Sequence, residues 1–598
     1  MSTAILTGPP TGAAVPALGD GLRTLGFDVV DADSCDDLAA RLAALPAHER
    51  VAVVDRRFVG HPHALRLALT DPRFPAGAVS GAVGVDATAR QALLEAVTDK
   101  STTDPDRLAE ALGRAVQVHR PELGVLVAAV PDDEAARAEA ERAVAAVDDE
   151  AVRLRSAVKS RDGFFTTFFI SPYSRYIARW CARRGLTPNQ VTTASLLVAL
   201  AAAACAATGT RPGYIAAGVL LIASFVLDCT DGQLARYSLR YSKLGAWLDA
   251  TFDRAKEYAY YAGLALGAAR GGDDVWALAL GAMILQSVRH VVDFSFNEAN
   301  HDAVANTSPT AALSDRLDSV GWTVWARRVV VLPIGERWAL IAVLTAATTP
   351  RTVFVVLLIG CALAGCYTTA GRLLRSVTRR AARTDRAAAA LAELADTGPV
   401  AEGVARAGAR ATRRVPAAAP ALAFTGAAAL VATACLAPAG SWWPLLAAAV
   451  YALTSGAAVS IPLRGFLDWL VPPIFRAAEY TTVLVLAARS GDTGVNSALP
   501  AAFGLVAAVA YHHYDTVYRI RGGTGAPPRG LVRATGGHEG RVLVVAAAAA
   551  LAYGHNGSLK LVLATLAGVL ALMVLTESIR FWMSSEAPAV HDETGEPA

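Results

Sequence analysis

The sequence contains little that would stabilise a small secreted protein. Seven cysteines occur among 598 residues, none of them in a Cys-x-x-Cys pair, and several lie within apolar runs. Such cysteines are typical of reduced side chains packed in a protein interior, so a disulfide framework and a zinc site are both excluded. The first residues also lack a basic stretch followed by an apolar run, and no secretory signal peptide is expected.

Charge is scarce as well. Charged residues make up 18% of the chain and the formal net charge is only +3, which gives no indication of a nucleic-acid partner. Hydrophobic residues reach 54%, and the mean hydropathy of +0.37 is too high for a soluble protein of this length. We therefore expect a mainly α-helical polytopic membrane protein whose partners include the lipid bilayer.

The first part of the chain differs from the rest in composition. Residues 1–155 mix charged and apolar side chains, and short β-like runs alternate with helical stretches rich in Ala, Leu and Arg, which predicts a cytosolic α/β domain. Residues 132–160 contain many charges and good helix formers without a break, which predicts one exposed helix leading to the membrane. The predicted strands are 4–6, 27–30, 51–54 and 124–130.

Two membrane domains are expected to follow, over residues 156–390 and 391–598. The first begins at 162–184, where aromatic residues are interleaved with arginines, as in an amphipathic helix at a membrane interface. Later apolar runs approach the ~20 residues that cross a bilayer. Twelve spans are predicted: 191–208, 213–229, 246–268, 275–296, 337–350, 352–371, 418–437, 442–461, 470–488, 497–517, 541–554 and 558–582.

Arginine and lysine are unevenly shared between the loops. One set of loops is rich in them, whereas the opposite loops contain only Arg211, Arg270, Arg351 and Arg489. Because basic loops stay in the cytoplasm, this pattern predicts a multi-pass protein of the cell membrane with both termini and the active site facing the cytoplasm.

Four aspartates lie near a predicted membrane boundary. Asp228 and Asp231 end one span, and Asp249 and Asp253 begin the next, so each pair shares a helix face. Acidic groups at such a depth are costly and indicate a functional site. Their oxygen ligands suit Mg²⁺, Mn²⁺ or Ca²⁺ rather than zinc.

With Gly232, Ala235, Arg236 and Gly245, the four aspartates complete the pattern Asp-x2-Asp-Gly-x2-Ala-Arg-x8-Gly-x3-Asp-x3-Asp. This pattern resembles the signature of the CDP-alcohol phosphotransferase (CDP-alcohol phosphatidyltransferase) family, and every fixed position is present. The resemblance implies a membrane enzyme that holds two divalent ions, Mg²⁺ or Mn²⁺. It further implies transfer of the phosphoalcohol part of a CDP-alcohol donor to an acceptor hydroxyl, with release of CMP.

The resemblance also assigns roles to the aspartates. Asp228, Asp231 and Asp249 are expected to be metal ligands, and Asp253 is expected to deprotonate the attacking hydroxyl, with its own metal ligation left open. Facing carboxylates that bridge two metals can clamp a pyrophosphate and neutralise charge as the phosphoanhydride breaks.

The remaining motif residues suit CDP binding. Gly232 and Gly245 allow close approach of nucleotide and backbone, and the small Ala235 leaves room. Arg236 is suited to bidentate contact with phosphate, and Ser242 could add a hydrogen bond to the phosphates.

Two groups of residues outside the motif are further candidates for substrate binding. Asn189 and Thr192, in the segment LTPNQVT, resemble the family's entry to the first span and either contribute to the cytidine pocket or only begin a helix. The candidates for an acceptor pocket, each of which could equally make a buried structural hydrogen bond, are Arg254, Arg289, His290 and Asp293.

The chain contains an internal repeat. Arg254, Glu257 and Tyr258 recur as Arg476, Glu479 and Tyr480, and Asp293 recurs as Asp515, with the same displacement (476 − 254 = 222; 515 − 293 = 222). The positions equivalent to the four aspartates are Val450, Leu453, Val471 and Phe475. The second membrane domain is therefore predicted to be a degenerate six-span copy without a metal site. It either acts as an internal pseudo-dimer partner, in place of or beside a homodimer, or binds an anion through its polar residues.

The N-terminal domain begins with AILTGPPTGAA, where a nucleotidyltransferase has a glycine-rich loop with a basic residue. That basic residue is missing, so we expect an inactive domain that is either a degenerate nucleotidyltransferase-like domain or another Rossmann-like domain.

Several functions remain open at this point. The favoured one is synthesis of a phospholipid or of an inositol-phosphate-type phosphodiester, and the alternative within the family is a soluble CDP-inositol-like donor that gives a polar phosphodiester. Twelve spans in two repeats also fit a transporter, and a membrane scaffold is the third reading.

Overall fold

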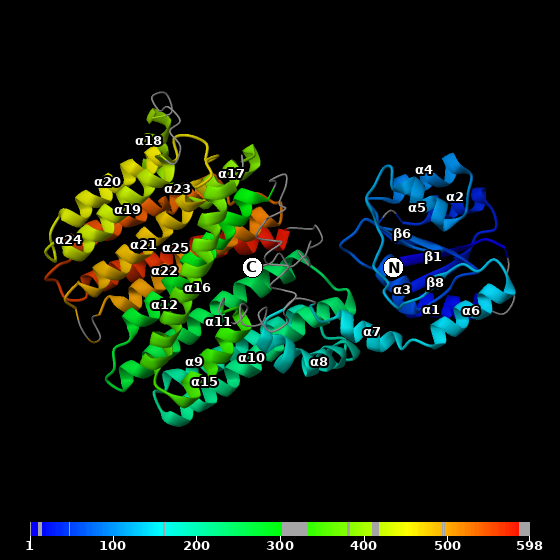
Figure 1. Cartoon of the computed structure of the whole chain (residues 1–598), viewed down its shortest axis with the longest axis horizontal. Helices are drawn as coiled ribbons and strands as arrows, with labels where there is room; N and C mark the ends of the chain where they lie inside the picture. The colour runs from blue at the N-terminus through cyan, green and yellow to red at the C-terminus, as the bar shows by residue number, and fades with distance from the viewer. Residues whose placement is uncertain are drawn as a thin grey trace.

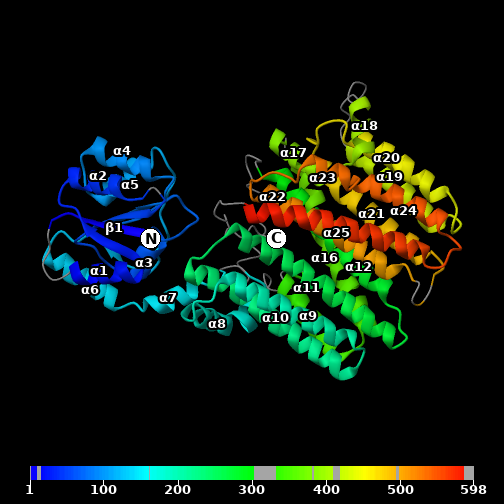
Figure 2. The same ribbon diagram turned by 180° about the vertical axis from the view of Figure 1, so that it is seen from behind.

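The computed structural model describes residues 2–9, 15–46, 48–159, 162–301, 332–379, 383–408, 418–492, 494 and 497–584. The chain forms an N-terminal α/β head beside a larger body of helices, and Figures 1 and 2 show helices α6 and α7 passing from one to the other. The body contains the long apolar helices of the chain. A helical membrane protein with an α/β head, as the sequence predicts, is therefore confirmed at this level.

A six-stranded sheet in the order β2-β1-β3-β6-β5-β7 forms the centre of the head. β1 is parallel to β2 and β3, whereas β6 is antiparallel to both β3 and β5. Helices cover both faces, with α2, α4 and α5 on one and α1, α3 and α6 on the other (Figure 1). The elements are β1 (Ser2–Thr7), α1 (Val15–Thr24), β2 (Phe27–Asp31), α2 (Cys35–Ala44), β3 (Arg50–Asp55), β4 (Val59–Gly60), α3 (Pro62–Leu69), β5 (Ala76–Val79), β6 (Ala82–Val85), α4 (Arg90–Lys100), α5 (Pro105–Leu112), β7 (Val118–His119), β8 (Ala128–Ala129), α6 (Glu134–Ala145) and α7 (Asp149–Ser156).

The head departs from the sequence-based expectation in three places. The strand expected over 124–130 is reduced to β8, Ala128–Ala129, and residues 124 and 125 form a turn. Strands β5 and β6 were not expected, because Ala and Gly have low strand propensity. Their small residues are explained by helix α3, since a Cβ on Gly77 would lie 2.2 Å from the carbonyl oxygen of Ala68. The single helix expected over 132–160 is two helices, because Asp148 caps a new helix by accepting a hydrogen bond from the amide of Ala151.

The helical body begins with the short π-helix Thr166–Ile170, followed by α8. A 3₁₀ turn, Asp468–Leu470, precedes α21. The helices are α8 (Ser171–Arg183), α9 (Pro188–Ala207), α10 (Arg211–Ser238), α11 (Lys243–Arg270), α12 (Trp276–Asn300), α15 (Ile334–Ala347), α16 (Pro350–Arg379), α17 (Asp385–Leu394), α18 (Pro399–Gly408), α19 (Ala418–Leu436), α20 (Trp443–Ala458), α21 (Val471–Ala488), α22 (Leu499–Arg521), α23 (Arg529–Ala534), α24 (Gly537–Leu551) and α25 (Ser558–Ser584).

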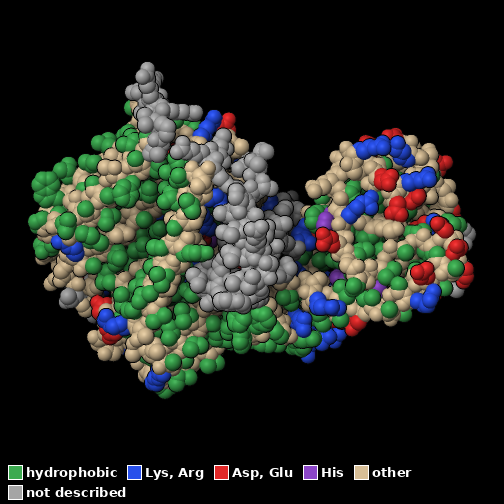
Figure 3. Space-filling model, in the orientation of Figure 1, with side chains coloured by type: hydrophobic (Ala, Val, Ile, Leu, Met, Phe, Trp, Pro, Cys, Tyr) green, Lys and Arg blue, Asp and Glu red, His purple; other side chains and the backbone are tan. Residues whose placement is uncertain are grey.

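Among the described residues, 7 helices are long and apolar enough to cross a membrane. They are α9, α10, α12, α16, α19, the helix that runs from Asp468 through α21, and α25. The other expected spans coincide with helices α11, α15, α20, α22 and α24, which are shorter or more polar. Figure 3 shows hydrophobic side chains over much of the body, whereas acidic and basic side chains gather on the head.

Close packing of small residues fixes α11 against α9. A Cβ on Gly263 would lie 2.3 Å from the carbonyl oxygen of Ala203, and one on Gly267 would lie 2.1 Å from that of Ala206. The two glycines are four residues apart, the spacing that lets membrane helices approach closely. This contact sets the position of α11, which carries half of the acidic motif.

The second half of the body repeats the helix pairings of the first. Helix α9 packs on α10 and α11, and α19 packs in the same way on α20 and α21. The pairs α10 with α15 and α12 with α16 likewise have counterparts in α20 with α24 and α22 with α25. The two halves meet where α12 contacts α21 and α22.

The head and its connecting helix α7 contact the turn that links α10 to α11. Arg73 of the head lies over the Tyr241 ring at 4.3 Å, and Arg153 of α7 donates a 3.0 Å hydrogen bond to the carbonyl oxygen of Tyr237. At the other end of α7, Asp149 accepts a hydrogen bond from the backbone amide of His63. Burial, with Arg66 nearby, lowers the pKa of His63 to about 4, so this imidazole is neutral at neutral pH.

Replacing Gly267 by alanine should force α9 and α11 apart. Overpacking of this kind costs ~1–3 kcal/mol, so we expect the melting temperature of the detergent-solubilised chain to fall by several degrees. The matched control is Gly281→Ala on α12, where the nearest atom to an added Cβ is 3.7 Å away. Equal melting temperatures for the two variants would contradict the close contact between α9 and α11.

Candidate metal centre and phosphate site

Three aspartates converge from two helices. Asp228 lies near the end of α10, and Asp249 and Asp253 lie in the first turns of α11. One carboxylate oxygen from each lies within 4.8 Å of the other two. The spacing of the residues along each helix places them on facing surfaces, and the turn between the helices brings the surfaces together.

The turn between α10 and α11 has a defined geometry. Leu239 ends α10 in the left-handed region with φ 49°, an uncommon conformation for a residue other than glycine. Ser242 then caps α11, and its hydroxyl accepts a 2.9 Å hydrogen bond from the amide of Gly245. Ser242 therefore has a structural role in the turn, and its contact with phosphate stays a prediction.

Asp231 lies one turn beyond Asp228 on α10 and is 4% exposed. It is not among the three converging aspartates, but it lies beside Thr192 of α9, and its Oδ2 atom is buried without a hydrogen-bond partner among the described residues. An unsatisfied buried carboxylate oxygen is costly, and a cation is the group that would satisfy it. Four carboxylates with an orphaned oxygen fit a hard divalent cation such as Mg²⁺ or Mn²⁺.

A lysine that the sequence analysis missed lies inside the acidic cluster. The side chain of Lys256 is fully buried, and its ammonium group pairs with Asp228 and, at 3.3 Å, with Asp253. Lys256 is three residues after Asp253, so it shares a helix face with that aspartate, and this spacing was the available signal. Its charge offsets part of the repulsion between the carboxylates.

The predicted CDP-binding residues gather around the same turn. A Cβ on Gly245 would lie 2.7 Å from Oδ1 of Asn189, so the glycine permits α9 and α11 to meet there. The space beside Gly232 is open apart from the guanidinium of Arg236, which would lie 3.5 Å from an added Cβ. Arg236 also donates a 2.6 Å hydrogen bond to the carbonyl oxygen of Ala157, just after α7. Ala235 is buried, 9% exposed.

The four acceptor-pocket candidates line one cavity of about 190 Å³. Arg254 follows Asp253 on α11, but none of the four aspartates lines the cavity. The other three candidates lie on α12, and Gln286, Arg337 and residues 332–334 complete the lining. Asp293 is paired with Arg372 of α16. The structure thus brings Arg254 of α11 together with three residues of α12, whereas the sequence could only place them on two successive helices.

The charge around this cavity is not balanced. Arg254 donates a 2.8 Å hydrogen bond to Glu257, and Arg337 contacts the same carboxylate at 3.2 Å. Within the described part of the chain, Glu257 is the one acidic group within ion-pair distance of these two arginines. Two guanidinium groups therefore share one carboxylate, which leaves one excess positive charge beside the cavity.

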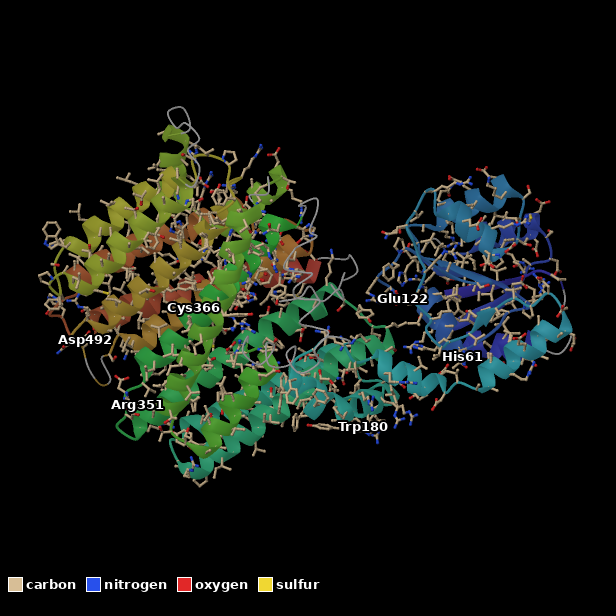
Figure 4. The ribbon with its side chains drawn as sticks, viewed as in Figure 1. His61, Glu122, Trp180, Arg351, Cys366 and Asp492 are labelled. Atoms are coloured by element: carbon tan, nitrogen blue, oxygen red, sulfur yellow. The ribbon has the colours of Figure 1, made fainter. Side chains whose placement is uncertain are left out.

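The acidic cluster lies at the end of the body next to the head. Trp180 of α8 lies close to the head, whereas Arg351 and Asp492 lie at the far side of the body (Figure 4). The contact between Arg236 and Ala157 places the motif at the near side. Aromatic side chains of α8 are exposed here, with Tyr173 46%, Tyr176 45% and Trp180 53% accessible.

Comparison with known families agrees with this geometry. The sequence profile of the CDP-alcohol phosphatidyltransferase family matches residues 185–350, which contain the aspartates and the cavity. A second profile, described as a family of unknown function (DUF5941), matches residues 385–598. The chain therefore carries a CDP-alcohol phosphatidyltransferase domain, an enzyme domain, followed by a DUF5941 region.

Two of the curated relatives are named as synthases of inositol phosphate lipids, and a third as a bifunctional transferase and synthase. A phosphatidylinositol phosphate synthase of Streptomyces avermitilis is 31% identical over 155 residues, 26% of this chain and 59% of the relative. An archaetidylinositol phosphate synthase of Pyrococcus horikoshii is 37% identical over 91 residues, 15% of this chain and 47% of the relative. A bifunctional IPC transferase and DIPP synthase of Aquifex aeolicus is 32% identical over 114 residues, 19% of this chain and 26% of the relative. The chain thus spans between a quarter and three fifths of these relatives.

Replacing Lys256 by methionine should make the acidic cluster depend on added metal. Removing one partner of a buried ion pair costs ~3–5 kcal/mol, so the melting temperature in chelator should fall. Mn²⁺ or Mg²⁺ should restore it and should stabilise this variant more than the unmodified chain. The control is Lys243→Met at the start of α11, outside the cluster. An equal metal-induced shift in all three proteins would contradict the role of Lys256.

Proposed function

We propose that the chain is a metal-dependent membrane phosphotransferase that transfers the phosphoalcohol part of a CDP-alcohol to an acceptor hydroxyl and releases CMP. The observation that carries the proposal is the convergence of Asp228, Asp249 and Asp253 within 4.8 Å. The residue after Asp253, Arg254, lines an arginine-rich cavity. The matching family profile over 185–350 supports the same reaction class.

Separate residues of the chain bind the donor and accept the proton. Arg236 binds the phosphates of the donor, whose cytidine lies toward Asn189 and Thr192. Asp253, the residue before Arg254, takes the proton of the acceptor hydroxyl. A bond forms between the acceptor oxygen and the phosphorus attached to the alcohol, and the phosphoanhydride bond breaks so that CMP leaves with the electron pair. Divalent ions held by the four aspartates, when bound, neutralise charge on the pyrophosphate.

The acceptor in this proposal carries a phosphate group. The excess positive charge shared by Arg254 and Arg337 supports an anionic ligand in the cavity. The second half of the body offers a comparison, because Arg476 and Arg541 there share Glu479 in the same way. That pair has a second carboxylate, Asp396, at 2.7 and 2.8 Å from the two guanidinium groups. In the first half, the anionic group of the acceptor would take the corresponding place.

An inositol phosphate is the acceptor that fits this charge best, and CDP-diacylglycerol is the corresponding lipid donor. The names of the relatives from Streptomyces avermitilis and Pyrococcus horikoshii support inositol phosphate chemistry. The Aquifex aeolicus relative supports the alternative of a soluble CDP-inositol-like donor that gives a polar phosphodiester. We favour the lipid product, because the cluster lies at the end of long apolar helices.

We also propose where the parts of the chain lie. The basic loops, the acidic cluster, the head and both termini face the cytoplasm, and α8 lies along the membrane surface. The interleaved exposed aromatic and basic side chains of α8 support this placement.

The DUF5941 region is proposed to be a degenerate copy of the first membrane unit. Its helix pairings match those of the first half, and the network of Arg476, Glu479 and Arg541 matches that of Arg254, Glu257 and Arg337. The last pair of arginines is displaced by 204 residues (541 − 337 = 204) rather than 222, because fewer residues separate α22 from α24 than separate α12 from α15. The copy lacks the aspartates and forms a pseudo-dimer with the active unit.

The head is proposed to be catalytically inactive. The acidic groups that follow its parallel strands are already paired with arginines. Arg56 pairs with Asp31 and Asp33, and Arg57 pairs with Asp55 at 2.9 Å. A nucleotidyltransferase would need such carboxylates for a metal ion.

Replacing Asp253 by asparagine should abolish CMP release. Loss of a general base lowers the rate by ~10²- to 10⁴-fold, and removal of divalent metal by chelator should have a comparable effect on the unmodified chain. The measurement is CMP release from CDP-diacylglycerol with inositol phosphate or glycerol phosphate, followed by identification of the product.

The control for this variant is Asp273→Asn, an exposed aspartate after the opposite end of α11 that pairs with Arg351. It should retain full activity. Unchanged CMP release by the Asp253 variant would refute the assigned base, and absence of CMP release from every donor by the unmodified chain would refute the proposed reaction.

Replacing Arg289 by glutamine should weaken binding of the acceptor but not binding of the donor. Loss of a charged contact to phosphate should raise the KM for inositol phosphate by roughly tenfold or more and leave the KM for the CDP-alcohol unchanged. Arg270→Gln, beyond the cavity at the end of α11, is the matched control. An equal change in both KM values would contradict the placement of the acceptor.

A further inference from the structure

One residue of the DUF5941 region contacts two of the side chains that line the cavity. Tyr514 lies on α22, which packs on both α11 and α12. The guanidinium carbon of Arg254 lies 5.2 Å from the centroid of the Tyr514 ring, and the ring of His290 lies 4.2 Å from the same centroid. Tyr514 is 3% exposed, so both contacts are shielded from solvent.

These two contacts restrict the side chains of Arg254 and His290, which line the cavity. Arg254 is adjacent in sequence to Asp253, and His290 is one turn before Asp293. A guanidinium over an aromatic face is attracted by the ring quadrupole, and the attraction is larger when the pair is desolvated. Tyr514 therefore restricts the guanidinium of Arg254 on one side while Glu257 binds it on the other.

A second contact ties the same catalytic helix to the DUF5941 region. Trp247, two residues before Asp249, stacks on Trp582 of α25 with ring centroids 6.3 Å apart. Tyr511 of α22 donates a hydrogen bond of 2.9 Å to Ser578 of α25, which holds α22 and α25 together there. Trp247 and Arg254 are seven residues apart and share one face of α11, so both aromatic contacts with the second half lie along the same side of the helix that carries Asp249 and Asp253.

We propose that the DUF5941 region completes the acceptor pocket of the active half, with Tyr514 as a positioning residue that orients Arg254 and His290 for an anionic acceptor. The inference rests on the proposed function of the cavity and adds to it a role for a region that has none assigned. Because the tyrosine belongs to the same chain, each active unit has its own copy at all protein concentrations.

The variants that test this are Tyr514→Leu and Tyr514→Phe. Leucine removes the aromatic face, whereas phenylalanine keeps it. The matched control is Phe503→Leu, an aromatic residue on the same helix that packs edge-on against Trp276 at 5.7 Å, more than two turns from Tyr514. It removes an equivalent contact between the two halves without touching the cavity.

Two measurements separate the outcomes. The first is titration of the detergent-solubilised full chain with inositol phosphate, which needs no turnover, and the second is the KM for inositol phosphate and for CDP-diacylglycerol in CMP release. We expect Tyr514→Leu to weaken inositol phosphate binding and to raise its KM by about tenfold, with the donor KM and the rate at saturation nearly unchanged. Tyr514→Phe should stay within about threefold of the unmodified chain.

An equal loss in Tyr514→Leu and Phe503→Leu would overturn the inference, since it would indicate packing alone. Unchanged binding in Tyr514→Leu would also overturn it. If the unmodified chain bound inositol phosphate tightly but released no CMP, the proposed reaction would fail while the role of Tyr514 could still be measured by titration. If the unmodified chain did not bind inositol phosphate, the pocket would not be an anion site and the inference would fail with it.

Discussion

Mutual repulsion of carboxylates buried between two helices is the constraint on which the rest of this structure depends. Asp228 and Asp231 on α10 face Asp249 and Asp253 on α11, and like charges brought together in a buried place oppose folding unless a cation offsets them. Lys256 supplies one positive charge from within α11, and the orphaned oxygen of Asp231 leaves room for more. The contact of Gly263 and Gly267 with α9 then holds α11 in place.

The surroundings of this cluster come from three separate parts of the chain. The turn between α10 and α11 is held by Arg73 of the head and Arg153 of α7, and Arg236 donates to the backbone just after α7. On the other side, Tyr514 of the DUF5941 region packs on Arg254. The phosphotransferase motif therefore lies at a junction, and its two helices are braced both by the head and by the second half of the body.

The two halves of the body illustrate how one charge network can have different consequences. In both halves an arginine and a glutamate three residues apart are joined by a second arginine from a later helix. In the second half Asp396 brings the network to two acids and two bases, so it is neutral and needs no ligand. In the first half the network keeps an excess positive charge, and that charge borders the cavity.

The sequence by itself determined the motif and located the long apolar helices, because these depend on residue spacing along single helices. It correctly paired Asp228 with Asp231 and Asp249 with Asp253, since i, i+3 and i, i+4 positions share a helix face in any fold. It missed β5 and β6, whose Ala and Gly residues are selected by contact with α3 rather than by strand propensity. Only the tertiary structure decided which helices meet. It alone placed Lys256 beside Asp228 and joined Arg337 to Glu257. It also brought Tyr514 to Arg254 across 260 positions of chain (514 − 254 = 260). Such contacts follow from packing between helices and leave no local pattern in the sequence.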